Sequence, residues 1–353
     1  HQAALPRHYV ARQKLCLRAT TDYWVNARDG QPFFLLNQAV DPGMLQVLEH
    51  EIVPRLEREV PNQPTPEQLE ADAKLHRFTV IFDREGYSPQ FLRTMKDKRI
   101  ACLTYHKYPG EDWPQEEFFP CPVQLASGAY VEMHLAERGT FLGGKVWVRE
   151  IRKRTESGHQ TSLLSSDYRS HLGPVAASMF ARWSQENFFR YMREHYGLDR
   201  LVDYSTEEIP DTTKVVNPQY RRLDGQVRNK QAHLTRKLAA FSAMNLKGEI
   251  EPKKVAAFEQ KKAELQEQIE GLTQDLDELK SQRKALKHHI TIAELPEEER
   301  FKQLSTQSKL LIDTIKMVAY RAETDMAQMA RETMRREDDA RSLLRGELKL
   351  DLS

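Results

Sequence analysis

The feature that most constrains the fold is a seven-residue repeat of apolar side chains in the last third of the chain. One column consists of Phe258, Leu265, Leu272, Leu279 and Leu286. The companion column consists of Val255, Ile269, Leu276 and Ile290, with Lys262 and Arg283 as polar interruptions. This period places both columns on one stripe of a helix, as in a coiled coil. We expect one helix over residues 255–290, with its stripe buried by residues 297–335 folded back upon it; pairing between two chains is the alternative.

The repeat also indicates a division of the chain near residue 225. Residues 1–224 hold most of the aromatic residues, glycines and prolines, whereas residues 225–353 are nearly free of them. Long stretches without glycine and proline are typical of long helices. We therefore expect an α/β domain over residues 1–224 and an all-α, coiled-coil-like arm over residues 225–353.

Charge and cysteine content exclude several classes of protein. The 353 residues include 53 basic and 52 acidic side chains, which gives a formal charge of +1. DNA contact would therefore depend on local basic clusters. No run of about 18 apolar residues is present, so we expect no membrane-spanning helix. Cys16, Cys102 and Cys121 are far apart, which argues against a zinc ribbon or a disulfide framework.

The first part of the chain contains signals for a hairpin and for a parallel sheet. Asp29-Gly30 separates two runs rich in aromatic and β-type residues, 21–27 and 32–39, which predicts a hairpin. The apolar run 78–82, a helix over 90–98 and the run 100–105 predict a strand–helix–strand unit. A β-rich region follows, with strands expected at 130–135, 145–151 and 162–165. Residues 174–196 then predict a helix that ends before Gly197.

Two carboxylates in this part are candidates for metal binding. Asp83 directly follows the buried strand, and active sites gather at the carboxyl ends of strands in open sheets. A carboxylate there suits hard Mg²⁺, although strand-end Asp residues often only cap a turn. Glu186 lies in a helix with large apolar residues around much of its circumference, where a carboxylate needs a partner or a metal. An ion pair with Arg182, four residues earlier, is the structural alternative.

Basic residues form a local cluster after the α/β region. Lys214 to Lys247 contains only one acid, Asp224. The candidates for phosphate contact in this stretch are Arg221, Arg222, Arg228 and Lys230. A solvated linker and helix face is the alternative interpretation. Arg182 and Arg193, which flank Glu186, are further candidates for orienting a phosphate through their planar guanidinium groups.

The sequence resembles bacterial insertion-sequence transposases of the DDE class. In one group of these, the catalytic glutamate lies in a Tyr-x2-Arg-x3-Glu-x6-Lys signature. The matching positions here are Met179, Arg182, Glu186 and Arg193, so the Arg and Glu match while Met and Arg replace Tyr and Lys. Further segments resemble this group between about residues 7 and 325: RHYVARQKLCLRATTDYWVNA, FTVIFDREGYSP, LTYHKY, NPQYRRLD and KMVAYRAET.

The resemblance implies a ribonuclease H-like core with a β-rich insertion, and metal-dependent phosphoryl transfer at DNA ends. Asp83 would be the second Asp and Glu186 the glutamate of a triad that holds Mg²⁺ or Mn²⁺. The first Asp is expected on a core strand upstream of residue 5 and so outside this chain, with Asp22 as the less favoured alternative. A chain that lacks this strand is expected to be inactive by itself. We expect Asp83 and Glu186 to lie within about 10 Å of each other, as two-metal chemistry requires.

The same resemblance implies transposon-end and target DNA as partners, self-association, no membrane, and a cytoplasmic, nucleoid-associated location in a bacterium. The alternative function is a non-catalytic coiled-coil interaction or DNA-binding protein with a degenerate nuclease-like domain. In that case the helical arm, and not the carboxylates, would carry the function.

Overall fold

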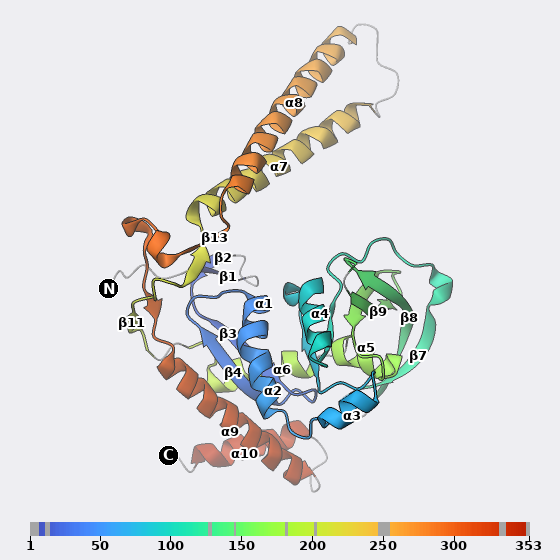
Figure 1. Ribbon diagram of the computed structural model, residues 1–353, viewed down its shortest axis with the longest axis vertical. Helices are drawn as coiled ribbons and strands as arrows, with labels where there is room; N and C mark the ends of the chain where they lie inside the picture. Colours follow the sequence, from blue (N-terminus) through green and yellow to red (C-terminus); the bar gives the residue numbers. More distant parts are fainter. Residues whose placement is uncertain are drawn as a thin grey trace. The chain divides into compact units, whose positions relative to one another are not determined.

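The computed structural model describes residues 7–10, 15–125, 129–144, 146–180, 183–200, 203–245, 255–331 and 337–350. The chain folds as two compact units (Figure 1). The larger unit joins residues 7–205 to residues 304–350, and the smaller unit consists of residues 206–303. The C-terminal helices after residue 304 thus belong with the α/β part of the chain.

The main sheet of the larger unit begins with the predicted strand–helix–strand unit. β5 (Thr79–Phe82) and β6 (Ala101–Tyr105) pair in parallel and are connected through α4 (Pro89–Asp97). The hydroxyl of Ser88 accepts a hydrogen bond from the amide of Phe91 at 3.2 Å, so it caps α4 as its type predicts. The prediction of this unit is confirmed.

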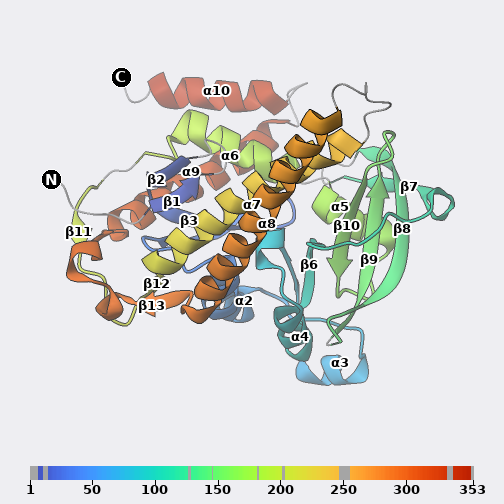
Figure 2. The same ribbon diagram turned by 90° about the horizontal axis from the view of Figure 1, so that it is seen from above.

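Antiparallel strands complete the sheet, whose order within the described residues is β5-β6-β10-β9-β8-β7 (Figure 2). The bounds are β7 (Phe119–Gln124), β8 (Tyr130–Leu142), β9 (Val146–Arg154) and β10 (Gln160–Ser165). The β-rich prediction is confirmed, but β8 and β9 extend beyond the predicted runs 130–135 and 145–151. Their extra residues form one continuous ladder that closes at the Gly143-Gly144 turn.

Helices cover both faces of this sheet. Alternate side chains of β5 point to opposite faces, so each set packs against a different group of helices. Val80 and Phe82 belong to a core with the helical segment over residues 44–59 and with α4. Ile81 packs on the opposite face with residues of α5 (Leu172–Phe180). The helical segment has three parts: α1 (Met44–Val47), the π-helical η1 (Leu48–Ile52) and α2 (Val53–Glu59). A mixed sheet with helices on both faces confirms the α/β prediction in this general form.

The predicted hairpin at Asp29-Gly30 is present. β3 (Thr21–Asn26) and β4 (Pro32–Gln38) pair antiparallel, and Gly30 has a φ of 89°, which favours glycine. A second hairpin is formed by β1 (Arg7–Val10) and β2 (Leu15–Arg18). Two short helical elements and one helix also lie in this unit: η2 (Arg84–Gly86), η3 (Gln115–Glu117) and α3 (Pro66–Ala71).

Three more helices complete the larger unit. They are α6 (Trp183–Tyr196), α9 (Gln307–Arg331) and α10 (Glu337–Leu350). The predicted helix over 174–196 corresponds to α5 and α6, on either side of residues 181–182, which lie outside the described residues. α6 ends as predicted, since Gly197 follows it with a φ of 59°.

The smaller unit is built on an antiparallel pair of long helices, α7 (Pro218–Asn245) and α8 (Val255–Ala285). Asp224 bonds Arg283 at 2.6 Å, and Lys230 pairs with Asp275. Residue numbers that increase along α7 therefore pair with residue numbers that decrease along α8, which shows that the two helices are antiparallel. The short elements of this unit are β11 (Thr206–Glu207), β12 (Lys214–Val216), β13 (His289–Thr291), η5 (Ile292–Glu294) and η6 (Glu297–Glu299); β14 (Gln303–Leu304) lies at the boundary.

The stripe predicted on α8 is real, but its predicted partner is wrong. The less exposed residues of α8 lie at 258, 262, 265, 269, 272, 276, 279 and 283, which is the predicted seam. It packs against Val227 and Leu234 of α7, with Leu276 fully enclosed, and not against residues 297–335. The helix also ends at Ala285 instead of reaching Ile290, because Ile290 pairs with Val215 in the ladder of β12 and β13.

Candidate active site

A cavity of about 710 Å³ lies beside β5 in the larger unit. One wall consists of β3 residues Tyr23–Asn26, and the facing wall consists of residues 78–83, which include β5. The helical segment over residues 44–59 closes one side, and Ala177, Ser178 and Phe189 of α5 and α6 lie on another. Arg28 and Asp83 are the charged residues among those that line it.

Asp83 lies where the sequence predicted, at the carboxyl end of β5. Its side chain is exposed, and its Oδ1 accepts a hydrogen bond from the amide of Arg84 at 2.6 Å. Asp83 therefore caps the turn, which was the alternative to metal binding in the sequence analysis. This hydrogen bond uses only one of the two carboxylate oxygens. Because Phe82 lies opposite Thr104 in the parallel register, the end of β6 lies beside this carboxylate. An exposed carboxylate next to two strand ends is accessible to a cation and its water ligands.

Glu186 lies within α6, and its side chain is outside the described residues, as is Arg182. Arg193 lies in the last turn of α6 and is half-buried. The distance between the carboxylates of Asp83 and Glu186 thus stays a prediction. Among the side chains that the structure describes, no three His, Cys, Asp or Glu residues come together as a metal cluster.

α6 is fixed in place by aromatic and polar contacts that the sequence did not reveal. Phe188 is buried between Trp24 and Tyr320, with ring centroids 5.3 and 5.0 Å away. The hydroxyls of Tyr191 and Tyr196 both donate to the carboxylate of Glu323 on α9, the latter at 2.6 Å. These contacts join the helix that carries Glu186 to α9 at both its middle and its end.

Glu323 is nearly inaccessible, and its charge is balanced from α10. Arg341 approaches Glu323 at 3.4 Å, and Arg345 donates to the hydroxyl of Tyr191 at 2.9 Å. Burial and the neighbouring carboxylate raise the pKa of Tyr191 to about 12. The pKa of Tyr196 is raised for the same two reasons. Both hydroxyls therefore remain protonated donors at neutral pH.

Asp22, the alternative candidate for a first acid, has a structural partner. Lys309 of α9 donates to its Oδ2 at 2.7 Å and also pairs with the buried Asp313. Asn37 donates to the other oxygen of Asp22. Burial raises the pKa of Asp22, while the charge of Lys309 opposes that rise. The carboxylate thus joins α9 to β3, and Asp22 is not among the residues that line the cavity beside Asp83.

A polar cluster at the end of β6 also escaped the sequence analysis. His106 has its Nδ1 3.5 Å from Glu150 Oε1. The same oxygen accepts hydrogen bonds from Ser162 and Arg152, each at 2.9 Å. Burial acts to raise the pKa of Glu150, but these three donors outweigh it and leave the pKa lowered. Arg152 also donates to the carbonyl of Glu111 at 2.7 Å, so the cluster holds the loop after β6 against the sheet.

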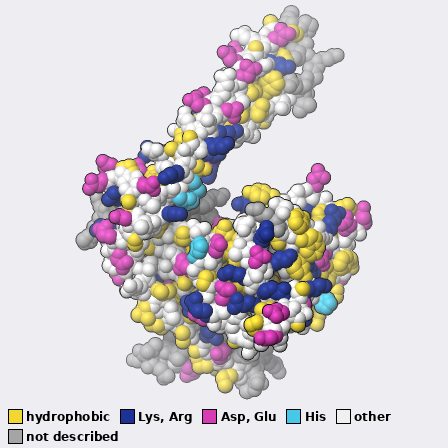
Figure 3. Space-filling model, in the orientation of Figure 1, with side chains coloured by type: hydrophobic (Ala, Val, Ile, Leu, Met, Phe, Trp, Pro, Cys, Tyr) yellow, Lys and Arg dark blue, Asp and Glu magenta, His cyan; other side chains and the backbone are white. Residues whose placement is uncertain are grey.

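The predicted basic cluster lies on α7. Arg222 pairs with Glu299, Arg228 with Asp224, and Lys230 with Asp275, so acids offset much of its charge. Figure 3 shows the resulting mixture of basic (dark blue) and acidic (magenta) side chains along this helix pair. Arg221 and Arg236 are exposed and have no ion-pair partner among the described residues. Solvent-exposed pairs contribute little stability, so DNA phosphates can compete for their basic members.

No helix in the described part of the chain combines the length and apolar character needed to cross a membrane. A family model described as a transposase protein matches residues 1–352, nearly the whole length. The chain therefore belongs to this transposase family, whose members are nuclease-type enzymes that act on DNA. No curated protein and no solved structure matches the chain.

Proposed function

We propose that the protein is a transposase of the DDE class with a ribonuclease H-like core, in which Asp83 and Glu186 hold Mg²⁺ or Mn²⁺. The reaction is phosphodiester hydrolysis and strand transfer at transposon ends. The observation that carries the proposal is Asp83, an exposed carboxylate at a strand end beside a large cavity, in a chain of the transposase family. The oxygen donors fit a hard cation that keeps several water ligands.

In this proposal each residue has a separate role. When bound, the cation supplies a Lewis acid that polarises the phosphate and lowers the pKa of a water or 3′-hydroxyl. Asp83 would bind the cation through the carboxylate oxygen that does not accept a hydrogen bond from Arg84. Glu186 would bind it from α6, the helix that Tyr191 and Tyr196 attach to α9. Arg182 and Arg193 orient the phosphate through their guanidinium groups.

Calorimetric titration of the full chain with Mn²⁺ tests this assignment. Asp83→Asn and Glu186→Gln each remove one charged ligand with little change in shape, so each should weaken Mn²⁺ binding by about tenfold or more. Asp97→Asn and Glu194→Gln are matched controls, since both side chains are exposed and lie in the same unit. Unchanged Mn²⁺ affinity in both site variants would contradict the proposal.

We propose further that the outer face of α7 contacts DNA phosphates. At about 100° per residue, Arg221, Arg228 and Arg236 project within about 80° of one another. They lie between about 110° and 170° away from the line of Val227 and Leu234, which faces α8. Packing against α8 therefore leaves this arginine face exposed.

The salt dependence of DNA binding tests the arginine face. The double variant Arg221→Gln/Arg236→Gln should reduce the slope of log K against log salt by about two, since each lost phosphate contact removes about 0.9. Lys280→Gln/Lys284→Gln on α8 is a control with the same change of charge. Equal slopes for the two double variants would remove α7 from the DNA interface.

A further inference from the structure

α9 has a row of exposed apolar side chains along one side, which we call the α9 stripe. Leu311, Ile315, Val318 and Met329 are each more than half exposed, Met329 most of all at 76 %, and Ala322 between them is exposed as well. At about 100° per residue, all five side chains project within about 60° of one another. The helix that was expected to pack on α8 therefore carries an apolar stripe that nothing covers within the described residues.

The opposite side of α9 is held by buried polar contacts. Lys309 donates to Asp22 of β3 at 2.7 Å, and Glu323 accepts a hydrogen bond from Tyr196 of α6 at 2.6 Å. Lys309, Asp313 and Glu323 are all buried, whereas the stripe projects away from them. α9 therefore keeps its place in the larger unit without any contact through the stripe, which leaves the stripe available to a partner.

The composition of this exposed side indicates a protein partner and not a nucleic acid. Among the described side chains of α9, only Arg321 and Asp325 are both charged and exposed. A phosphate backbone is bound through several cations, whereas the centre of a protein–protein interface is apolar and poor in charge. The stripe covers on the order of a few hundred Å², the size at which an exposed apolar patch on a monomer is often functional.

Arg321 and Asp325 indicate which protein the stripe binds. Neither has an ion-pair partner among the described residues, and both are exposed. They are one turn apart, but Arg precedes Asp, which is the less favourable order for an ion pair within a helix. Both lie along the same edge of the stripe, since positions 321 and 325 are about 40° apart around the helix. One edge of the stripe thus presents one cation and one anion.

A second copy of α9 supplies the complementary charges when the two helices run antiparallel. A twofold axis perpendicular to the helix pair brings the same edge of both helices together. With the axis level with residue 323, each Arg321 lies level with the partner's Asp325, because both positions are two residues from the axis. Val318 then lies within one residue of the level of the partner's Met329, so apolar side chains also meet.

A parallel pair would not satisfy the same charges. Identical residues lie level with each other in a parallel pair, so Asp325 would face the partner's Asp325, and like charges in contact are unfavourable. A parallel pair shifted by four residues would form one Arg321–Asp325 pair and leave the other two charges unpaired. The positions of the two charges therefore favour the antiparallel arrangement.

We infer that the exposed side of α9 is an interface between two copies of this chain, which pair antiparallel through the α9 stripe and form two ion pairs between Arg321 and Asp325. The stripe is smaller than the roughly 800 Å² that each partner contributes to a standard interface, so the dimer is reversible. The inference goes beyond the metal chemistry proposed above and does not depend on it.

Sedimentation equilibrium of the full chain tests this interface, at concentrations from about 1 to 200 µM, where a small interface dissociates. Arg321→Asp and Asp325→Arg each reverse one of the two charges. The double variant Arg321→Asp/Asp325→Arg exchanges them. Both side chains are exposed, so the substitutions should leave the monomer folded, which circular dichroism melting verifies.

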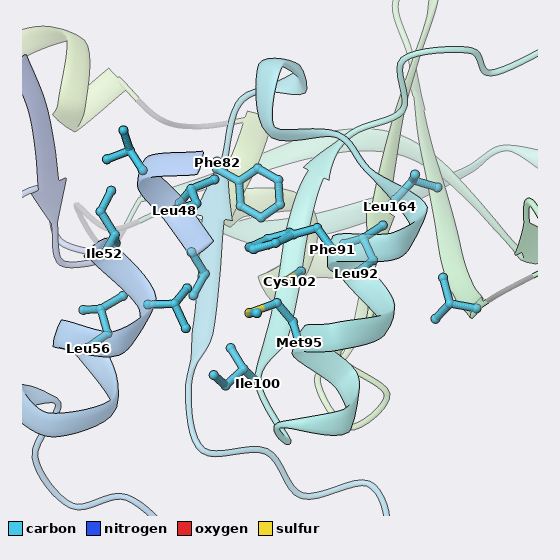
Figure 4. Close-up of a cluster of buried hydrophobic side chains, with 14 of the residues drawn as sticks. Leu48, Ile52, Leu56, Phe82, Phe91, Leu92, Met95, Ile100, Cys102 and Leu164 are labelled. Atoms are coloured by element: carbon cyan, nitrogen blue, oxygen red, sulfur yellow. The ribbon is translucent and has the colours of Figure 1, made fainter. Parts of the chain in front are cut away.

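α4 offers a matched pair of control positions. Arg93 and Asp97 are also exposed, four residues apart, and without an ion-pair partner among the described residues. The apolar side chains of α4 point into the core and leave no exposed stripe; Figure 4 shows Phe91, Leu92 and Met95 there. Arg93→Asp and Asp97→Arg therefore make the same changes of charge on a helix that should not pair, and the dimer should remain as stable as in the unmodified chain.

A reversible dimer is expected, and each single reversal at α9 should weaken it by about tenfold or more, because both ion pairs become contacts between like charges. An equimolar mixture of the two single variants should dimerise within about threefold of the unmodified chain, since the mixed dimer regains two opposite-charge pairs. The double variant should do the same by itself.

Three results would overturn the inference. The first is a chain that stays monomeric at all these concentrations. The second is a dimer that neither reversal at α9 weakens, since a different surface or a parallel pairing would then join the chains. The third is a pair of weakened variants whose mixture does not recover, because the two charges would then not meet across the interface.

Discussion

Glu323→Gln is expected to loosen the attachment of α6 to α9 without changing the shape of the side chain. Glu323 is 3 % exposed and accepts hydrogen bonds from the hydroxyls of Tyr191 and Tyr196. Its charge is balanced by Arg341, whose side chain is 13 % exposed. The substitution keeps an acceptor for one tyrosine but removes the charge that Arg341 faces.

The size of the effect follows from these contacts. A hydrogen bond to a charged acceptor contributes about 1.5–3 kcal/mol, against about 0.5–1.5 kcal/mol for a neutral one. Two such bonds therefore lose about 2 kcal/mol together. The unpaired charge of Arg341 adds to this loss, because a partly buried charge without a partner is unfavourable. We expect the free energy of unfolding of the larger unit to fall by about 2–3 kcal/mol.

Urea unfolding followed by tryptophan fluorescence measures this change, since Trp24 packs against Phe188 of α6. A second measurement is the absorbance titration of the tyrosines. The carboxylate of Glu323 helps to raise the pKa of Tyr191 to about 12, so Glu323→Gln should lower that pKa toward its ordinary value. Glu347→Gln on α10 is the control, because Glu347 is exposed.

Two results would refute this reasoning. A Glu323→Gln variant as stable as Glu347→Gln would show that the charge contributes nothing to the attachment of α6. An unchanged tyrosine titration would show that the two hydroxyls do not contact this carboxylate in solution.

Three further predictions concern other parts of the chain. Leu276→Ala should destabilise the pair of α7 and α8 by about 2–4 kcal/mol, because the side chain is 2 % exposed, whereas Leu238→Ala, at a side chain that is 45 % exposed, should change helix melting little. The lowered pKa of Glu150 stabilises the fold above the ordinary value of about 4.3, so stability should be lost as the pH falls below it, and acid unfolding of Glu150→Gln should be less steep there. Burial raises the pKa of the Cys102 thiol, so a thiol reagent at pH 8 should modify the partly exposed Cys121 well before Cys102.

Local signals predicted the elements in which one short segment determines the structure. The predicted hairpin at Asp29-Gly30 and the predicted end of α6 before Gly197 are both present, and Ser88 caps α4 as its residue type favours. Each depends on a glycine conformation or a single hydrogen bond within a few residues. The parallel pair β5 and β6 was predicted because two short apolar runs flank one helix, which leaves few alternative topologies.

The partner of α8 was missed because the matching stripe on α7 is shorter and more polar. Val227, Leu234 and Phe241 are seven residues apart on α7, but charged residues surround them. The polar interruptions on α8 have partners there: Lys262 lies over the ring of Phe241, and Arg283 bonds Asp224. Pairing by charge across two helices depends on their register, which the spacing within one helix does not reveal.

Contacts between distant segments were beyond sequence reasoning altogether. Lys309 lies 287 positions from Asp22, and Glu323 lies 132 positions from Tyr191. No periodicity connects such residues, because their meeting depends on how whole elements pack. The same holds for the cavity, whose two walls come from β3 and from β5. Asp83 was identifiable because a carboxylate that ends an apolar run is a local feature.

Iron-directed cleavage of the polypeptide tests most directly whether Asp83 and Glu186 share one metal site. The full chain is incubated with Fe²⁺, ascorbate and peroxide, so that hydroxyl radicals cut the backbone beside the bound ion, and the fragments are sized by mass spectrometry. We expect cuts at both Asp83 and Glu186 that Mg²⁺ suppresses and that disappear together in either Asp83→Asn or Glu186→Gln. Cutting at only one of these positions, or cuts near Asp83 that survive Glu186→Gln, would contradict a shared metal site.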